Sequence, residues 1–186
     1  MFASGNTIKL WAPNHPLAGN KNSYVIKPHD QVLCGAVVRA RLHAGRLAQI
    51  PNACGAPISL DAAKKAAAPA LAEAGKNSWT IAVAIVDPSG NLVYYEKMDN
   101  TQLGSANIAV DKARTAAMFK RSSKAFQDAL AAGGEGLRVL GLQGVTPVEG
   151  GFPLLMDGKI VGGIGVSGMT SAQDAQCAKA GADSVK

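Results

Sequence analysis

The sequence is poor in aromatic and charged residues, and it has no histidine beyond its first quarter. Aromatic residues make up 5% and charged residues 17% of the 186 positions, so alanine, valine and glycine must fill most of the core. The histidines His15, His29 and His43 all lie in an irregular N-terminal segment that is interrupted by prolines. A Ser-His-Asp or Cys-His catalytic site needs a histidine in the fold, so the rest of the chain excludes both.

Cysteines are also few. Cys34, Cys54 and Cys177 show no pairing typical of a zinc site. Cys177 lies among alanines in a predicted helix and is interpreted as a small buried hydrophobic residue. Whether Cys34 and Cys54 form a disulfide stays open, because the bond would require export of the chain. The chain has neither a signal-peptide pattern nor a run of about 18 apolar residues. We therefore expect no membrane span. A cytoplasmic location is slightly favoured, and periplasmic and secreted locations stay open.

The net charge of +6 is unevenly distributed. Residues 1–57 contain six basic residues and one acidic residue, which gives +5, whereas residues 58–186 contain 13 basic and 12 acidic residues, which gives +1. Nucleic-acid binding proteins usually gather basic and aromatic residues on one face of the fold. Because the predicted domain has almost no excess charge, we expect no nucleic-acid partner.

The chain divides into an irregular basic extension or leader over residues 1–57 and a domain over residues 58–186. Ser59 is expected to cap a helix that reaches about Ala74, with a kink or a break at Pro69. Strands follow at 79–86 and 92–97, helices at 106–119 and 124–131, a glycine-rich hairpin closed by Asp157-Gly158, and a last helix at 171–182. This order predicts an α+β domain with an antiparallel sheet flanked by helices. Its many small residues favour a homo-oligomer.

The second hairpin strand, Ile160 to Ser167, alternates branched residues with glycines. Glycine weakens a strand unless another backbone or a flat ligand must come close. Either a helix packs tightly on this strand or a planar molecule does. Gly162-Gly163-Ile164-Gly165 superficially resembles a dinucleotide-binding loop, but it lies within a strand and lacks the acidic residue that follows such loops. Packing of the sheet against a helix is the favoured interpretation.

Most acidic residues have structural interpretations. Asp87 and Asp157 lie in predicted turns, and Asp174 lies in the first turn of the last helix, where it meets the helix dipole. Glu149 is different, because it precedes Gly150-Gly151 and an apolar strand. A carboxylate beside two glycines is able to face a ligand pocket.

Several of these segments resemble the GlcG/HbpS-like haem-degrading domain family. The resemblance covers Ile58 to Lys186 and rests on four motifs in the family's order: the helix start at 58–65, the hairpin at 82–92, the helix at 112–119 and the glycine-rich hairpin at 144–168. It implies a profilin- or PAS-like sheet flanked by helices. It also implies haem as the cofactor, with a threonine of the central helix, here Thr115, as an iron contact.

The residues of the central helix agree with that expectation. Haem is a flat apolar disc with two propionates, so its site needs an apolar slot, close-approaching glycines and basic residues. The competing interpretation is an amphipathic core helix with Ile108, Thr115, Met118 and Phe119 inward and a solvated basic face. Residue types alone favour that interpretation, and the resemblance shifts the balance to haem. The predicted cofactor-binding residues are Thr115, Lys112, Arg114, Arg121, Phe119, Glu149, Gly150, Gly151, Gly163 and Gly165.

Three functions remain open. The first is a haem-binding accessory protein for sensing, scavenging or degradation. The second is a catabolic enzyme for a small metabolite, with Arg114, Glu149 and Tyr94 binding a carboxylate substrate, although no catalytic residue stands out. The third is an oligomeric assembly module without catalysis. The resemblance also implies a second mode of haem binding, because relatives fused to cobalamin adenosyltransferases use a histidine on the first helix. The first predicted helix here has no histidine. Binding by a histidine would therefore require one from residues 1–57.

Overall fold

A computed structural model describes residues 53–185 of the chain. Their elements are α1 (Leu60–Lys76), β1 (Ala82–Val86), β2 (Leu92–Lys97), α2 (Ser105–Met118), α3 (Ser123–Ala131), the 3-10 helix η1 (Gly134–Gly141), β3 (Gly151–Met156), β4 (Lys159–Ser167) and α4 (Ser171–Ala182). The predicted α+β fold is confirmed. The three histidines, Cys34 and most of the predicted extension lie outside the described residues.

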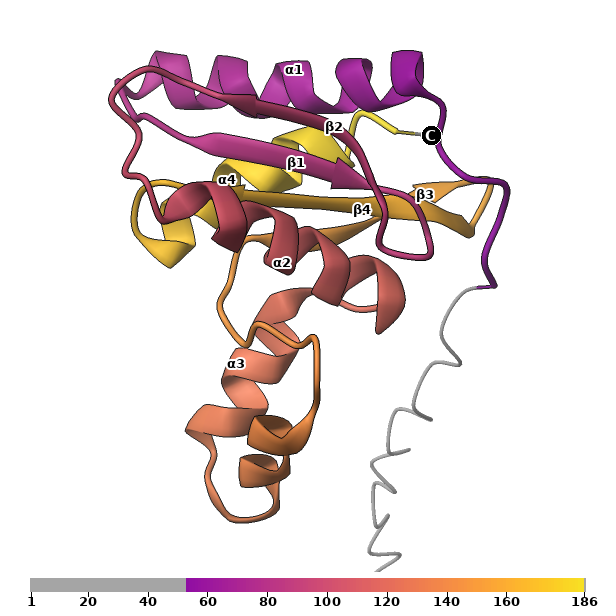
Figure 1. Ribbon diagram of the computed structural model, residues 1–186, viewed down its shortest axis with the longest axis vertical. Helices are drawn as coiled ribbons and strands as arrows, with labels where there is room; N and C mark the ends of the chain where they lie inside the picture. Colours follow the sequence, from indigo (N-terminus) through magenta and orange to yellow (C-terminus); the bar gives the residue numbers. More distant parts are fainter. Residues whose placement is uncertain (1–52, 186) are drawn as a thin grey trace, which may run out of the picture. The chain divides into compact units, whose positions relative to one another are not determined.

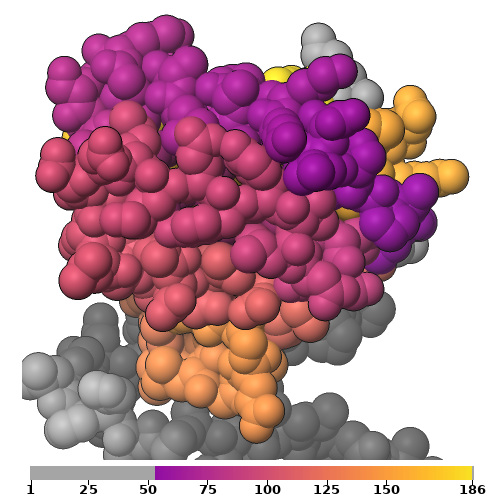
Figure 2. Space-filling model, turned by 45° about the horizontal axis from the view of Figure 1, so that its top comes forward, coloured from indigo at the N-terminus to yellow at the C-terminus, as the bar shows by residue number. Residues whose placement is uncertain are grey.

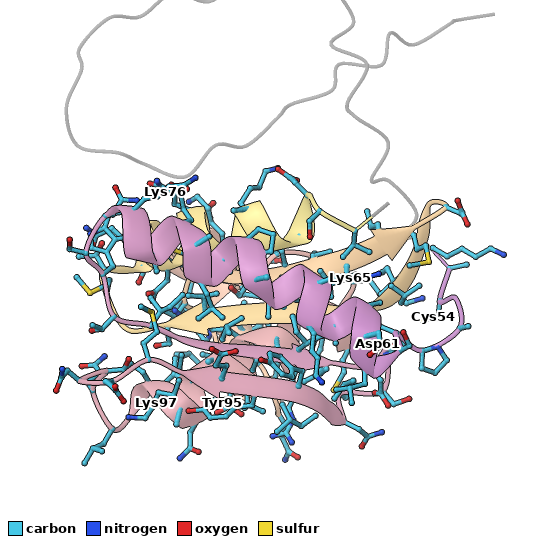
Figure 3. The ribbon with its side chains drawn as sticks, turned by 90° about the horizontal axis from the view of Figure 1, so that it is seen from above. Cys54, Asp61, Lys65, Lys76, Tyr95 and Lys97 are labelled. Atoms are coloured by element: carbon cyan, nitrogen blue, oxygen red, sulfur yellow. The ribbon has the colours of Figure 1, made fainter. Side chains whose placement is uncertain are left out.

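The four strands form one antiparallel sheet in the order β2-β1-β4-β3. Helices α1 and α4 pack together on one face, and α2 covers the other (Figure 1). Helix α3 and η1 extend beyond α2, away from the sheet (Figure 1). Strand β2 is an edge strand, and Tyr95 and Lys97 lie along it (Figure 3). Within residues 53–185, no helix is long and apolar enough to cross a membrane.

Strand β4 is the centre of the fold and is buried on both faces. Its branched residues Ile164 and Val166 join the core beneath α1 and α4. Gly163 and Gly165 face α2: a Cβ on Gly165 would lie 2.1 Å from the carbonyl oxygen of Ala109, and one on Gly163 would lie 2.5 Å from that of Ala113. A helix backbone therefore fills the space above these glycines, which confirms the favoured interpretation of the glycine-rich strand.

Helix α1 is continuous, so the expected break at Pro69 is wrong. Proline removes the hydrogen bond that its amide would give to the carbonyl four residues earlier, at Lys65. Lys65 is exposed, so water is able to satisfy this carbonyl. The buried face of α1 consists of Ala63, Ala66, Ala67, Ala70 and Ala74. Because these side chains are small, α4 comes close: a Cβ on Gly181 would lie 2.6 Å from the carbonyl oxygen of Ala66.

The predicted inward face of α2 is wrong in part. Ile108 and Met118 are exposed, whereas the buried face consists mainly of alanines together with Lys112 and Thr115. The glycines of β4 explain the difference, because a helix that lies this close to a sheet has room only for small side chains.

The predicted turns are confirmed. Asp157 and Gly158 both have positive φ angles, 49° and 72°, as a tight two-residue hairpin requires. Asp87 accepts hydrogen bonds from the amides of Ser89 and Asn91. Cys177 is fully buried, as predicted, and burial raises the pKa of its thiol to about 11.

Residues before the predicted domain boundary also contact the sheet. The amide of Gly55 donates to the carbonyl of Ile160, the amide of Ile160 to the carbonyl of Ala53, and the amide of Ile58 to the carbonyl of Val161. This segment lies beside the part of β4 that extends past β1, so it supplies hydrogen bonds that β1 cannot reach there.

We predict that Gly165→Ala destabilises the fold by about 1–3 kcal/mol, because the added methyl group would overlap the backbone of α2. Gly75→Ala is the matched control: Gly75 lies in α1, is exposed, and has no atom within 4 Å of the added methyl group. Urea unfolding should show a lower midpoint for the first variant and an unchanged or slightly higher midpoint for the control. Equal midpoints would contradict the close contact between α2 and β4.

Candidate functional site

Lys112 is the largest fully buried side chain in the described part of the protein. Its Nζ lies 2.8 Å from Oδ2 of Asp174 and 3.0 Å from the carbonyl oxygen of Val166. The other carboxylate oxygen of Asp174 accepts a hydrogen bond from the amide of Met169 at 3.0 Å. Burial raises the pKa of Asp174, because the loss of hydration outweighs the hydrogen bond from Lys112. The pair connects α2 to the first turn of α4, so Lys112 holds the fold together rather than facing a ligand.

Gly150 and Gly151 let the start of β3 pack against the same lysine. A Cβ on Gly150 would lie 2.9 Å from the Nζ of Lys112, and one on Gly151 would lie 2.3 Å from the Lys112 carbonyl oxygen. Gly150 also has a φ of 123°, which L side chains rarely adopt. The amide of Gly151 donates to Oγ of Ser123 at 2.9 Å. These two glycines therefore position the chain between α2 and α3.

The Thr115 hydroxyl fastens the loop over residues 142–150 to α2. It donates to the carbonyl of Asp111 at 2.8 Å and accepts from the amide of Thr146 at 2.8 Å. The side chain is fully buried. At the other end of the loop, the amide of Glu149 donates to Oε1 of Gln127 on α3 at 2.8 Å. Direct contact of Thr115 with an iron therefore requires this loop to move, and the predicted contact stays a prediction.

A pocket of about 360 Å³ opens between α3 and η1, and we call it the α3/η1 pocket. It belongs to the part of the protein that projects below the main body in Figure 2, where η1 and the residues after it are orange. The pocket is lined by Phe119, Arg121, Ala125, Phe126, Ala129, Gly136, Arg138, Val139 and Leu142. Phe119 and Arg121 were predicted as ligand-binding residues, and they line this pocket.

Other predicted residues lie elsewhere. Nε of Arg114 donates to the carbonyl of Gly90 at 3.0 Å, which places Arg114 beside the turn between β1 and β2. The hydroxyl of Tyr94 donates to Glu96, and Tyr94 packs with the core beneath α1, on the opposite face of the sheet from α2. The predicted grouping of Arg114, Glu149 and Tyr94 around one carboxylate substrate is therefore wrong. Gly163 and Gly165 lie under α2.

Five of the predicted residues thus lie at one corner of the domain: Thr115, Phe119, Arg121, Glu149 and Gly150. We define the α2–α3 corner as the end of α2, together with α3, η1 and the loop over residues 142–150. In residues 53–185, no group of three or more His, Cys, Asp or Glu side chains is arranged to hold a metal ion.

Sequence reasoning missed three partners that shape this corner. Asp174 was assigned to the helix dipole, although a lysine among the alanines of a buried helix face requires an acidic partner. Ser123 and Gln127 were not identified, because each bonds a backbone amide more than 20 residues away. No local pattern indicates such distant contacts.

Comparison with known proteins places the chain in a family. The model of the HbpS-like haem-degrading proteins matches residues 58–183, and the chain belongs to this family. It is 39% identical to protein GlcG of Escherichia coli K12 over 95 residues, which are 51% of this chain and 69% of that protein. It is 33% identical to an uncharacterised 15.0 kDa protein of Citrobacter freundii over 130 residues, which are 69% of this chain and 92% of that protein.

Solved structures show the same fold. A double mutant of HbpS from Streptomyces reticuli is 31% identical, with a TM-score of 0.65, and the match covers 83% of this chain and 99% of that one. A PduOC–haem complex is 26% identical, with a TM-score of 0.63, and the match covers 70% of this chain and 96% of that one.

We predict that Lys112→Met destabilises the protein by about 3–5 kcal/mol, because it leaves the carboxylate of Asp174 buried without its cation. The loss should be smaller at pH 5 than at pH 8. In the wild type the hydrogen bond from Lys112 partly offsets the rise that burial causes in the pKa of Asp174, and the variant lacks this bond, so its Asp174 pKa rises further. Lowering the pH therefore stabilises the folded variant more than the folded wild type. Urea unfolding at both pH values measures the effect.

Lys179→Met is the matched control, since Lys179 lies on α4, is 58% exposed and, within residues 53–185, forms an ion pair with Asp183 alone. Its change in stability should stay within about 0.5 kcal/mol. A loss for Lys112→Met as small as that of the control would contradict the structural role of the buried pair.

Proposed function

We propose that this domain binds haem and that the porphyrin lies at the α2–α3 corner. The observation that carries the proposal is the family assignment, supported by the likeness to a solved PduOC–haem complex over 96% of that chain. The corner combines an apolar pocket with a nearby arginine, which suits a flat apolar ligand with carboxylates. Phe119 would contact the ring, and Arg121 would bind a propionate.

Thr115 lies four residues before Phe119, which follows the last residue of α2, so the two side chains lie on the same side of the helix end. Under this proposal, the loop over residues 142–150 moves away, and the Thr115 hydroxyl is released from the amide of Thr146 to contact the iron. A hydroxyl is a weak ligand, so haem would exchange readily. Such exchange suits sensing, scavenging or delivery for degradation. Lys112, Gly150 and Gly151 would act indirectly, by holding the base of this loop.

The first test is a hemin titration of the full chain, followed by Soret absorbance. The wild-type protein should give a saturable shift, and Thr115→Val should weaken binding by about tenfold or more, because it removes the hydroxyl but keeps the shape. Thr115→Ser keeps the hydroxyl and should bind hemin nearly as well as the wild type. Arg114→Gln is the matched control, because Arg114 lies beside Gly90 rather than at the corner.

A full-length variant with His15, His29 and His43 changed to alanine completes this test. If the corner holds the iron, this variant binds hemin as the wild type does. Loss of the Soret shift in this variant alone would instead place the iron on a histidine of residues 1–52. Absence of any shift in the wild type would refute haem binding.

We also propose that the domain forms a homo-oligomer through the face of β2 that is left exposed within residues 53–185. Leu92 and Tyr95 are 49% and 36% exposed on the side of β2 that faces α2, and Met118 is 52% exposed on α2 near the turn at Gly90. A second copy would cover this apolar surface and the free edge of β2.

Leu92→Lys should therefore shift the protein toward the monomer in sedimentation experiments, because it places a charge on the proposed contact. Leu140→Lys is the control: Leu140 is 71% exposed but lies on η1, away from β2. A wild-type monomer, or equal dissociation in both variants, would contradict this interface.

A further inference from the structure

The α3/η1 pocket has an apolar floor that is fixed by close packing. Phe126 and Val139 are buried beneath it, with exposed fractions of 6% and 7%. The rings of Phe119 and Phe126 meet edge to face, with centroids 5.5 Å apart. Ala125 and Ala129 leave the space above the floor open because their side chains are short. A floor of this kind favours a flat apolar ligand.

Gly136 holds η1 against α3. A Cβ on Gly136 would lie 1.8 Å from the carbonyl oxygen of Ala129, so only glycine permits this contact. Helix η1, which forms one wall of the pocket, therefore packs directly against α3. The pocket is thus formed by close packing of these two helices.

Arg121 is held in place at one side of the pocket. Its Nε donates to the carbonyl of Phe119 at 3.1 Å, and its guanidinium lies 5.4 Å from the centre of the Phe126 ring. These contacts orient the side chain, and its two terminal nitrogens make no hydrogen bond within residues 53–185. In residues 53–185, no carboxylate oxygen lies within 4 Å of this guanidinium. A guanidinium so oriented is suited to bidentate binding of a carboxylate.

Arg138 supplies a second guanidinium from η1, the opposite wall. Its only carboxylate partner in the described part of the chain is Glu135, at 3.5 Å, and both side chains are largely exposed (79% and 92%). Such surface ion pairs are weak, so a ligand carboxylate is able to replace Glu135.

We propose that the α3/η1 pocket binds organic carboxylates with a flat apolar body, and that Arg121 and Arg138 hold the carboxylate. The volume of about 360 Å³ suits a two-ring aromatic acid or one edge of a porphyrin. The inference rests on the apolar floor of the pocket and on its two arginines. This inference extends the proposed function. If haem binds here, the pocket recognises its propionates rather than its iron.

The test is a titration of the full chain with 2-naphthoate and its uncharged counterpart 2-naphthamide, followed by naphthalene fluorescence anisotropy. The wild-type protein should bind the acid more tightly than the amide. Arg121→Gln and Arg138→Gln should each weaken binding of the acid by about tenfold, because each removes a charged hydrogen-bond donor. Neither variant should change the affinity for the amide.

Arg114→Gln serves again as the matched control and should bind the acid as the wild type does. Ala125→Phe fills the pocket without removing either arginine and should abolish binding of both probes. The inference is overturned if the wild type does not bind 2-naphthoate, or if the double variant Arg121→Gln/Arg138→Gln binds it unchanged.

A parallel titration with hemin and with hemin dimethyl ester, which keeps the iron but lacks free carboxylates, separates this inference from haem binding. If hemin binds but 2-naphthoate does not, haem binding stands and the carboxylate site is refuted. If 2-naphthoate binds through the two arginines and hemin does not, the carboxylate site stands and haem binding is refuted. If both hold, the dimethyl ester should bind at least about tenfold more weakly than hemin.

Discussion

The close approach of α2 to β4 is the constraint on which the rest of this domain depends. Gly163 and Gly165 carry no side chain where the backbone of α2 passes, and the facing residues Ala109 and Ala113 are equally small. Because the helix lies so near the sheet, Lys112 points past the strand to Asp174 and reaches the carbonyl of Val166. The same proximity places Thr115 under the loop over residues 142–150. Larger residues at the glycines would lift α2 and separate these contacts.

The sequence predicted the elements of the fold well, because its signals are local. Ser59, the Asp157-Gly158 turn and the glycine-rich strand each act within a few residues, and all are confirmed. The site was harder to predict, because its partners lie far apart in the chain. Lys112 and Asp174 are 62 residues apart, and Thr115 and Thr146 are 31 apart. The inward face of α2 was partly misassigned, since hydrophobicity favoured Ile108 and Met118 where close packing selects alanine.

The structure divides the predicted ligand-binding residues by role. Lys112, Gly150 and Gly151 belong to the interior, and Gly163 and Gly165 belong to the contact between sheet and helix. Phe119 and Arg121 line an open pocket, where Arg138 joins them from η1. Along α2 and the residues that follow it, Lys112 thus belongs to the frame, whereas Phe119 and Arg121, further along, are able to meet a ligand. That corner offers an apolar pocket with two guanidinium groups beside it.

The central proposal for this domain is that a ligand with carboxylates lies between α3 and η1. The most direct measurement is a crystal structure of the full chain with hemin bound, in which the iron is located by anomalous scattering. We predict that a propionate lies within hydrogen-bond distance of Arg121 and Arg138, with the porphyrin edge against Phe126. A porphyrin bound with high occupancy against β2, or on residues 1–52, and an empty α3/η1 pocket would contradict the claim.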